Sequence, residues 1–204
     1  MTMVENPFVF GKVVFGNHFC DREKEIEEIK KLVRSKQHIV IISPRRYGKT
    51  SLVINALERN SIPFIYVDCS FVEDEKNLAN LLLNDYVKKF DNIAMVEKFL
   101  KRFDFSFSIT LNPVSIIVSQ VKTNTLKSLL TEASKNYVLV FDEFQDINEK
   151  NPDLVNKIRS IVQFLDKSVI MLGSKRHLLD SMFLKPRGIF YNFGYSMHLG
   201  KIAP

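Results

Sequence analysis

Residues 38–59 read His-Ile-Val-Ile-Ile-Ser-Pro-Arg-Arg-Tyr-Gly-Lys-Thr-Ser-Leu-Val-Ile-Asn-Ala-Leu-Glu-Arg. The first five form an apolar, β-branched run typical of a strand buried on both faces, and the residues after Thr50 have helical character. Between them, residues 43–50 match the pattern G-x-x-x-x-G-K-[ST] except at its first position, which is Ser43. Strand, loop and helix form the context that this motif requires, because a helix N-terminus and loop amides favour anions. The stretch predicts an α/β fold with a phosphate-binding loop.

Each residue type in this loop has a role in holding a nucleotide. The lysine of the pattern reaches the β- and γ-phosphates, and the Ser or Thr hydroxyl holds Mg²⁺, so Lys49 and Thr50 take these roles here. Pro44 has no N–H, and the amides of residues 46–50 must therefore carry most of the phosphate contact. The alternative is an ordinary strand-turn-helix in which the Gly-Lys-Thr occurs by chance. The full candidate phosphate-binding set is Ser43, Pro44, Arg45, Arg46, Tyr47, Gly48, Lys49, Thr50 and Ser51.

A second buried run ends in two acids. Residues 137–143 read Tyr-Val-Leu-Val-Phe-Asp-Glu, which predicts a buried strand with a charged C-terminal tip. Ligands of open α/β sheets bind at the carboxyl ends of the strands, so Asp142 is expected to hold Mg²⁺, through water. Glu143 is then placed to orient and polarise a water for in-line attack on the γ-phosphate. Two acids in a solvated turn after a strand are the alternative.

Two further polar residues are candidates for the same site. Gln145 can position the attacking water, or it can be a surface glutamine that caps the strand end. Ser174 follows a third apolar run, residues 168–172, and can hydrogen-bond the γ-phosphate or the water. It can equally be the N-cap of a helix predicted over 175–183.

With these residues in place, the chain resembles the archaeal-type ATPases, P-loop NTPases of the signal-transducing STAND class that are related to AAA+ proteins and have bacterial members. In such proteins the first glycine of the loop is often replaced, and Pro-Arg-Arg-x-Gly-Lys-Thr is a frequent form. The resemblance rests on Asn6-Pro7-Phe8 with Gly11 and Val14, on Phe19-Cys20-Asp21-Arg22 with Glu25, and on residues 43–52, 142–145 and 173–174.

This resemblance implies a three-layer P-loop NTPase fold with a central, mostly parallel sheet and an inserted β-hairpin. It implies ATP and Mg²⁺ as ligands, with Asp142 and Glu143 as the second acidic motif. It also implies that residues 6–19, with Asn6 and Phe8, pack near the adenine and ribose. The strand ending at Ser174 is expected to lie between the phosphate-loop strand and the Asp142 strand, which would bring Ser174 beside the γ-phosphate.

The chain departs from this family at one arginine. Members often carry a Tyr-Gly-Arg turn after the last core helix, and that arginine can approach the γ-phosphate. The comparable residues 190–195 read Phe-Tyr-Asn-Phe-Gly-Tyr. Arg187, Arg46 and Arg176 are the candidates to replace it, and the sequence does not choose among them.

The chain is expected to form one ATPase domain over residues 1–204, with a nucleotide-flanking segment at 1–21. Residues 103–120 alternate apolar and polar side chains about a turn at Asn112-Pro113, which predicts the inserted hairpin. Its phenylalanine-rich face either packs on the core or binds a partner. Helices are expected at 22–35, with Asp21 as N-cap, at 76–102 with a break near 91–92, at 125–136 and at 152–166; strands are also expected at 64–67 and 195–199. Family members often carry a winged-helix region next, so a C-terminal domain of the full-length protein is expected to be absent here.

Composition limits the function classes. The net charge of +6 is more simply a solvated basic surface than a nucleic-acid site, and nucleic acid is expected only through a missing C-terminal domain. No apolar run approaches the ~20 residues that span a bilayer. Cys20 and Cys69 are isolated, and no metal is assigned to the four histidines, so a cytoplasmic protein is expected. An unidentified protein partner is expected, and the sequence does not give the oligomeric state.

Two functions fit these observations. The first is a Mg²⁺-dependent ATPase in which Lys49, Glu143, Ser174 and Gln145 act in catalysis and Thr50 and Asp142 hold the metal. The second is a nucleotide-gated switch or interaction module that binds ATP with little or no turnover.

Overall fold

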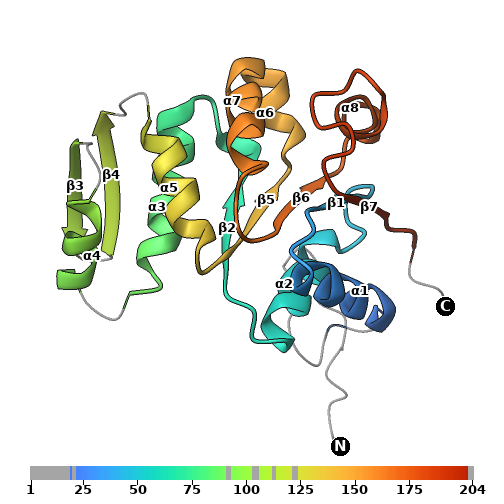
Figure 1. Ribbon diagram of the computed structural model, residues 1–204, viewed down its shortest axis with the longest axis horizontal. Helices are drawn as coiled ribbons and strands as arrows, with labels where there is room; N and C mark the ends of the chain where they lie inside the picture. The colour runs from blue at the N-terminus through green and yellow to red at the C-terminus, as the bar shows by residue number, and fades with distance from the viewer. Residues whose placement is uncertain are drawn as a thin grey trace, which may run out of the picture.

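A five-stranded parallel sheet forms the centre of the molecule, in the strand order β2-β5-β6-β1-β7 (Figure 1). The computed structural model describes residues 19, 22–90, 93–102, 106–111, 114–120 and 124–201. Strand β6 lies between β1 and β5, so the predicted α/β class and strand order are confirmed. The strands are β1 (Ile39–Ile42), β2 (Phe64–Asp68), β5 (Val138–Asp142), β6 (Val169–Gly173) and β7 (Tyr195–His198).

Helices cover both faces of this sheet and complete three layers. Alternate residues of the buried strands point to opposite faces, and each face has its own apolar cluster. Helices α1 (Glu23–Arg34) and α2 (Lys49–Arg59) pack with Ile39 and Ile41 on one face. The opposite face, with Val40 and Ile42, is covered by α3 (Glu75–Val87), α5 (Thr125–Ser134), α6 (Gln145–Lys150) and α7 (Pro152–Val162).

The predicted hairpin is present at one end of the molecule, together with α4 (Ile93–Leu100) (Figure 1). Its strands β3 (Ser106–Leu111) and β4 (Val114–Gln120) pair antiparallel. The side chain of Asn84 in α3 bonds both the N–H and the carbonyl of Ile116, at 2.8 and 2.7 Å. Ile116 is buried while Ile117 is exposed, so this face of β4 packs on the core. Phe103 and Phe105 lie outside the described residues.

Helix ends differ from the sequence prediction in three places. Asp21, the predicted N-cap, lies outside the described residues, and α1 begins after Arg22, whose guanidinium bonds Glu25 at 2.8 Å and the carbonyl of Gly200 at 2.7 Å. The short helix α6 was not predicted. The segment predicted as one helix over 175–183 divides into α8 (Arg176–Leu179) and a π-helical turn (Asp180–Leu184). Within the described ranges, no helix is both long and apolar enough to cross a bilayer.

Candidate functional site

The phosphate loop begins where β1 ends at the carboxyl edge of the sheet. Ser43 is buried, its N–H donates to the carbonyl of Gly173 at 3.2 Å, and its hydroxyl donates to the carbonyl of Pro44 at 3.2 Å. Serine is therefore accommodated at the position where the pattern has glycine. The backbone then turns through left-handed conformations at Arg46 (φ 69°) and Gly48 (φ 78°), and α2 starts at Lys49.

The side chains of this loop lie mostly at the surface. Pro44, Arg45 and Arg46 are exposed, and Tyr47 is half-exposed. Lys49 differs, because its side chain is only 9% exposed and turns toward the acidic strand. Thr50 and Ser51 follow Lys49 in the first turn of α2. The loop therefore has exposed side chains at residues 44–46 and a buried lysine at its end.

Asp142, at the end of β5, is held by α2, by β2 and by the backbone of the next residue. Its Oδ2 accepts hydrogen bonds from the Thr50 hydroxyl of α2 at 2.5 Å and from the Tyr66 hydroxyl of β2 at 2.9 Å. Its Oδ1 accepts the backbone N–H of Glu143 at 2.8 Å and lies 3.8 Å from the Lys49 Nζ. The carboxylate is 5% exposed, so these donors replace the water it has lost and fix its orientation.

Glu143 occupies a left-handed backbone conformation with φ of 49° immediately after the strand. Its Oε1 accepts from the Lys49 ammonium at 2.6 Å, and its Oε2 accepts from Gln145 Nε2 and from the Ser174 hydroxyl, each at 2.7 Å. Burial acts to raise the pKa of this carboxyl, but hydrogen bonds from Lys49, Gln145 and Ser174 together lower the pKa below its ordinary value of 4.5. Glu143 is therefore a carboxylate at neutral pH.

These contacts exclude one alternative each for Gln145 and Ser174, and their roles toward the water and the γ-phosphate stay predictions. Gln145 is completely buried, so its interpretation as a surface glutamine is wrong. Its Oε1 has no hydrogen-bond partner among the described residues and faces Gly173, where an added Cβ would lie 2.2 Å away. Ser174 donates to Glu143, while α8 starts two residues later without a side-chain cap, so Ser174 is not that helix's N-cap.

The loops after β5 and β6 are also joined by charge. Lys175 contacts Asp146 at 3.1 Å and pairs with Glu149, both in α6. These contacts connect the loop that carries Ser174 to α6. Asp68, in contrast, uses its side chain to accept the N–H of Ser70 at 2.9 Å in the turn that follows β2.

The remaining sequence candidates either lie outside the described residues or are exposed. Asn6 and Phe8 lie outside the described residues. Arg187 is exposed, and Arg176 is largely exposed with its Nε 3.5 Å from Asp180.

Tyr66 is the site residue that the sequence analysis missed. The alternation of β2 indicates which face the tyrosine occupies, but its contact with Asp142 depends on the pairing of two strands far apart in the chain. Only that register brings the phenol to the carboxylate.

The residues present fit a Mg²⁺ ion. Mg²⁺ prefers oxygen ligands and keeps several waters, and Thr50 and Asp142 supply a hydroxyl and a carboxylate that already lie side by side. Within the part of the chain that is described, no group of three or more His, Cys, Asp and Glu forms a metal site. Phosphate oxygens and water would therefore supply the other ligands.

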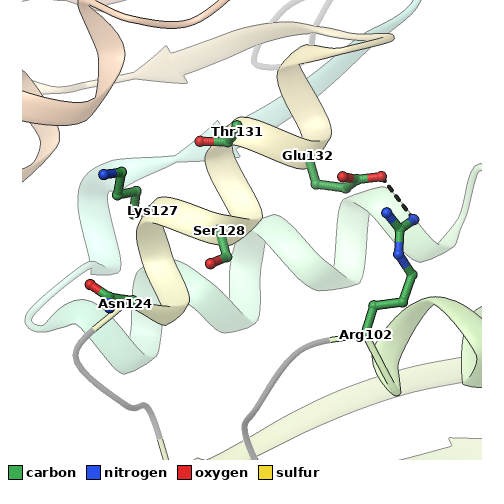
Figure 2. Close-up of a pocket in the computed structure, with 6 residues that line it drawn as sticks. All are labelled: Arg102, Asn124, Lys127, Ser128, Thr131 and Glu132. Carbon is green, nitrogen blue, oxygen red and sulfur yellow. Dashed lines mark ion pairs between the residues drawn. The ribbon is translucent and has the colours of Figure 1, made fainter.

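A separate hollow of about 470 Å³ lies beside α5 (Figure 2). An ion pair between Arg102 and Glu132, 2.9 Å long, closes one side of it. It contains none of the residues that surround Asp142 and Glu143. Its lining residues are Arg102, Asn124, Lys127, Ser128, Thr131 and Glu132.

Comparisons with known proteins agree with this architecture. A family model described as an ATPase domain predominantly from Archaea matches residues 19–184. A Walker-type ATPase of Pyrococcus abyssi superposes with a TM-score of 0.58 at 18% identity, over 89% of this chain and 53% of that one. The RuvB Holliday-junction branch-migration motor of Thermotoga maritima gives 0.46 at 11% identity, over 90% of this chain and 46% of that one.

This chain spans about half the length of both solved structures, and the likeness to the Pyrococcus protein shows a shared fold. None of the curated proteins searched matches the sequence.

Proposed function

Because this chain belongs to the family of ATPase domains found predominantly in Archaea, we propose that it binds ATP with Mg²⁺ and hydrolyses it at the carboxyl edge of the sheet. One observation carries the proposal. Lys49 of the phosphate loop lies 2.6 Å from Glu143 and 3.8 Å from Asp142, so phosphate-binding and acidic motifs meet in one place. Phosphoryl transfer to water depends on positioning and charge stabilisation, so this proximity of a phosphate-binding lysine and two carboxylates supports the proposal.

The phosphate loop and Lys49 supply binding. Amides of residues 46–50 and the N-terminus of α2 favour the negative charge of the phosphates. Lys49 pairs with Glu143 in this structure. Phosphate oxygens would compete with that carboxylate for the ammonium, and this competition couples nucleotide binding to the freedom of Glu143.

Thr50 and Asp142 are the proposed metal residues. A bound Mg²⁺ would neutralise charge on the phosphates. Asp142 is held in place by hydrogen bonds from Tyr66 and from the N–H of Glu143, so its free lone pairs can accept from ordered water. Thr50 brings its hydroxyl oxygen to the same point from the first turn of α2.

Glu143 is the proposed water-positioning residue, with Gln145 and Ser174 as its polar neighbours. Its lowered pKa makes it a weak base, so it acts mainly by orienting and polarising the water rather than by storing the proton. Ser174 and Gln145 both contact Oε2 and restrict the carboxylate to one orientation. The same two groups are placed to contact the water or the γ-phosphate.

The second candidate function is a nucleotide-gated switch with slow or no turnover. The observation that favours it is the exposed position of Arg176 and Arg187, which add no contact to these carboxylates among those described. An arginine at the γ-phosphate is worth about 10³-fold or more in rate, so its absence would leave a slow enzyme.

Wider features of the proposal rest on the sequence resemblance. Assignment to the STAND class of AAA-like ATPases is proposed on that ground, with Asn6 and Phe8 near the base and ribose. Residues 1–204 would form one ATPase domain with residues 103–120 as an insertion. A cytoplasmic location and an unidentified protein partner are proposed separately, from the sequence composition, and no nucleic-acid contact is assigned to residues 1–204.

Steady-state ATP hydrolysis and ATP binding test the two functions together. For the ATPase, we expect Mg²⁺-dependent hydrolysis by the wild type, a loss of about 10²-fold or more in Glu143→Gln with binding retained, and weak binding in Lys49→Ala. Tight binding with equally negligible hydrolysis in wild type and Glu143→Gln would favour the switch. If ATP fails to bind and Lys49→Ala is indistinguishable from wild type, both functions are wrong.

A further inference from the structure

Tyr66 lies on the edge strand β2 with its side chain directed along the sheet toward the metal residues. Strands β2 and β5 pair in parallel, with Tyr66 opposite Val140 and Asp68 opposite Asp142. Paired residues share a face of the sheet, so Tyr66 and Asp142 lie on the face that α1 and α2 cover. The ring of Tyr66 is partly buried against the apolar cluster of that face.

The hydroxyl of Tyr66 is fixed as a donor. An ionised carboxylate can only accept, so the 2.9 Å contact from Tyr66 to Asp142 Oδ2 is a hydrogen bond from the phenol to the acid. The same oxygen accepts from Thr50 at 2.5 Å.

The backbone of Tyr66 is bonded to a neighbouring helix. The N–H of Tyr66 donates to Asp85 Oδ2 of α3 at 3.0 Å, and Asp85 lies 3.7 Å from the ammonium of Lys89. This contact occupies the outer, unpaired side of the edge strand. It restricts movement of Tyr66 along the strand direction, and so keeps the phenol level with Asp142 at the end of β5.

We infer that Tyr66 is a positioning residue for the metal: it holds the Asp142 carboxylate toward Thr50 so that the two can receive Mg²⁺ with the nucleotide. This inference rests on the proposed function. Lys49 lies 3.8 Å from the other oxygen of Asp142 and attracts it in a competing direction. The Tyr66 hydroxyl opposes that attraction by a charge-assisted bond at Oδ2. Groups that orient a metal-binding carboxylate commonly change metal affinity about 10- to 100-fold when removed.

A purely structural role for the phenol predicts a different outcome. If the hydroxyl only satisfies its own hydrogen-bonding need, its loss would change stability and leave the response to Mg²⁺ unaltered. The two roles are therefore separated by the metal dependence of nucleotide binding, which a packing change alone does not alter.

The test is ATP binding by Tyr66→Phe, measured by calorimetry over a Mg²⁺ titration and again in excess EDTA. We expect the Mg²⁺ concentration at half-maximal effect to rise about tenfold, with ATP affinity in EDTA within about twofold of wild type. Tyr137→Phe is the matched control, because Tyr137 is half-buried just before β5, at the opposite end of the strand from Asp142. Circular-dichroism melting verifies that each variant is folded at the assay temperature.

A second arm asks whether Tyr66 acts through Asp142. In an Asp142→Asn background, Tyr66→Phe should have no further effect on the Mg²⁺ response, because the pair couples only through the carboxylate. A Mg²⁺ midpoint within twofold of wild type in Tyr66→Phe, or an undiminished shift in the Asp142→Asn background, overturns the inference alone. If the ATP affinity of the wild type does not depend on Mg²⁺, the proposed metal site and this inference are both wrong.

Discussion

The two halves of the site are built differently. The acidic half, residues 142–145 with Ser174, is buried or half-buried, and its carboxylates accept hydrogen bonds from β2, α2, α6 and the loop after β6. The phosphate loop, residues 43–48, exposes Pro44, Arg45 and Arg46 and is shaped by left-handed turns at Arg46 and Gly48. Lys49 and Thr50 belong to both, because they begin α2 and contact Glu143 and Asp142 respectively.

This difference separates two physical tasks. The acidic half fixes the positions of oxygens and finds its partners inside the chain, so its residues contribute to the stability of the fold as well as to chemistry. The phosphate loop presents backbone amides to an outside ligand, and its residues should contribute mainly to binding. Substitutions can test whether stability and binding really divide along this line.

Gly173→Ala is expected to give the largest loss of stability. A Cβ at this position would lie 2.2 Å from Gln145 Oε1 and 2.7 Å from Leu179 Cδ1, both in buried side chains. Overpacking of this kind costs about 1–3 kcal/mol and would displace the amide that holds Glu143. Urea unfolding measures it, with Gly200→Ala as control because nothing lies within 4 Å of that Cβ position. If Gly173→Ala loses no more unfolding free energy than Gly200→Ala, the acidic half is less tightly packed than its contacts indicate.

Gly48→Ala should weaken ATP binding strongly while it changes the stability of the fold only slightly. Its φ of 78° costs an alanine about 1 kcal/mol, but no atom lies within 4 Å of the added Cβ, so the fold should lose little. ATP affinity should fall by more than tenfold, because a shifted loop misaligns several amides at once. Calorimetric titration and urea unfolding of the same preparations give both quantities. Wild-type ATP affinity combined with a stability loss larger than that of Gly173→Ala would reverse the comparison.

The smallest of the three effects is expected from acid, which should reduce the contribution of Glu143 to the unfolding free energy. The pKa of Glu143 is below 4.5 in the folded protein, so its stabilising contribution is complete above the unfolded value and is lost as the pH falls through the folded pKa. The difference in unfolding free energy between wild type and Glu143→Gln should therefore narrow as the pH falls from 6 to 3. Other carboxyls titrate in both proteins and cancel. A constant difference across this range would contradict the assigned hydrogen bonds.

Much of the fold could be predicted because it depends on local pattern. Apolar runs gave the strands, and alternation about Asn112-Pro113 gave the hairpin whose pairing the structure confirms. The place of Ser174 between the two motif strands came from the family resemblance and was confirmed by the strand order. Helix α6 was missed because it is only six residues long and has no apolar period to reveal it.

The contacts within the site were less accessible to the sequence. Gln145 is polar and follows two acids, so composition favoured a surface position for it. The turn at Glu143 instead directs the side chain of Gln145 against Gly173. The contact between Tyr66 and Asp142 joins residues 76 positions apart and depends on strand register. Long-range pairing decides both, and no local pattern encodes it.

The strand order has a consequence for how the protein is made. Among the described residues, strand β1, which carries the phosphate loop, pairs with β6 and β7, and these lie at residues 169–173 and 195–198. The ribosome releases β1 before either of these strands, so β1 lacks both neighbours until β6 has been synthesised. Parallel pairing over such sequence separations is slow to form and leaves apolar edges open to wrong partners in the meantime. The loop that would hold the nucleotide therefore takes its final shape only after these later strands have joined β1.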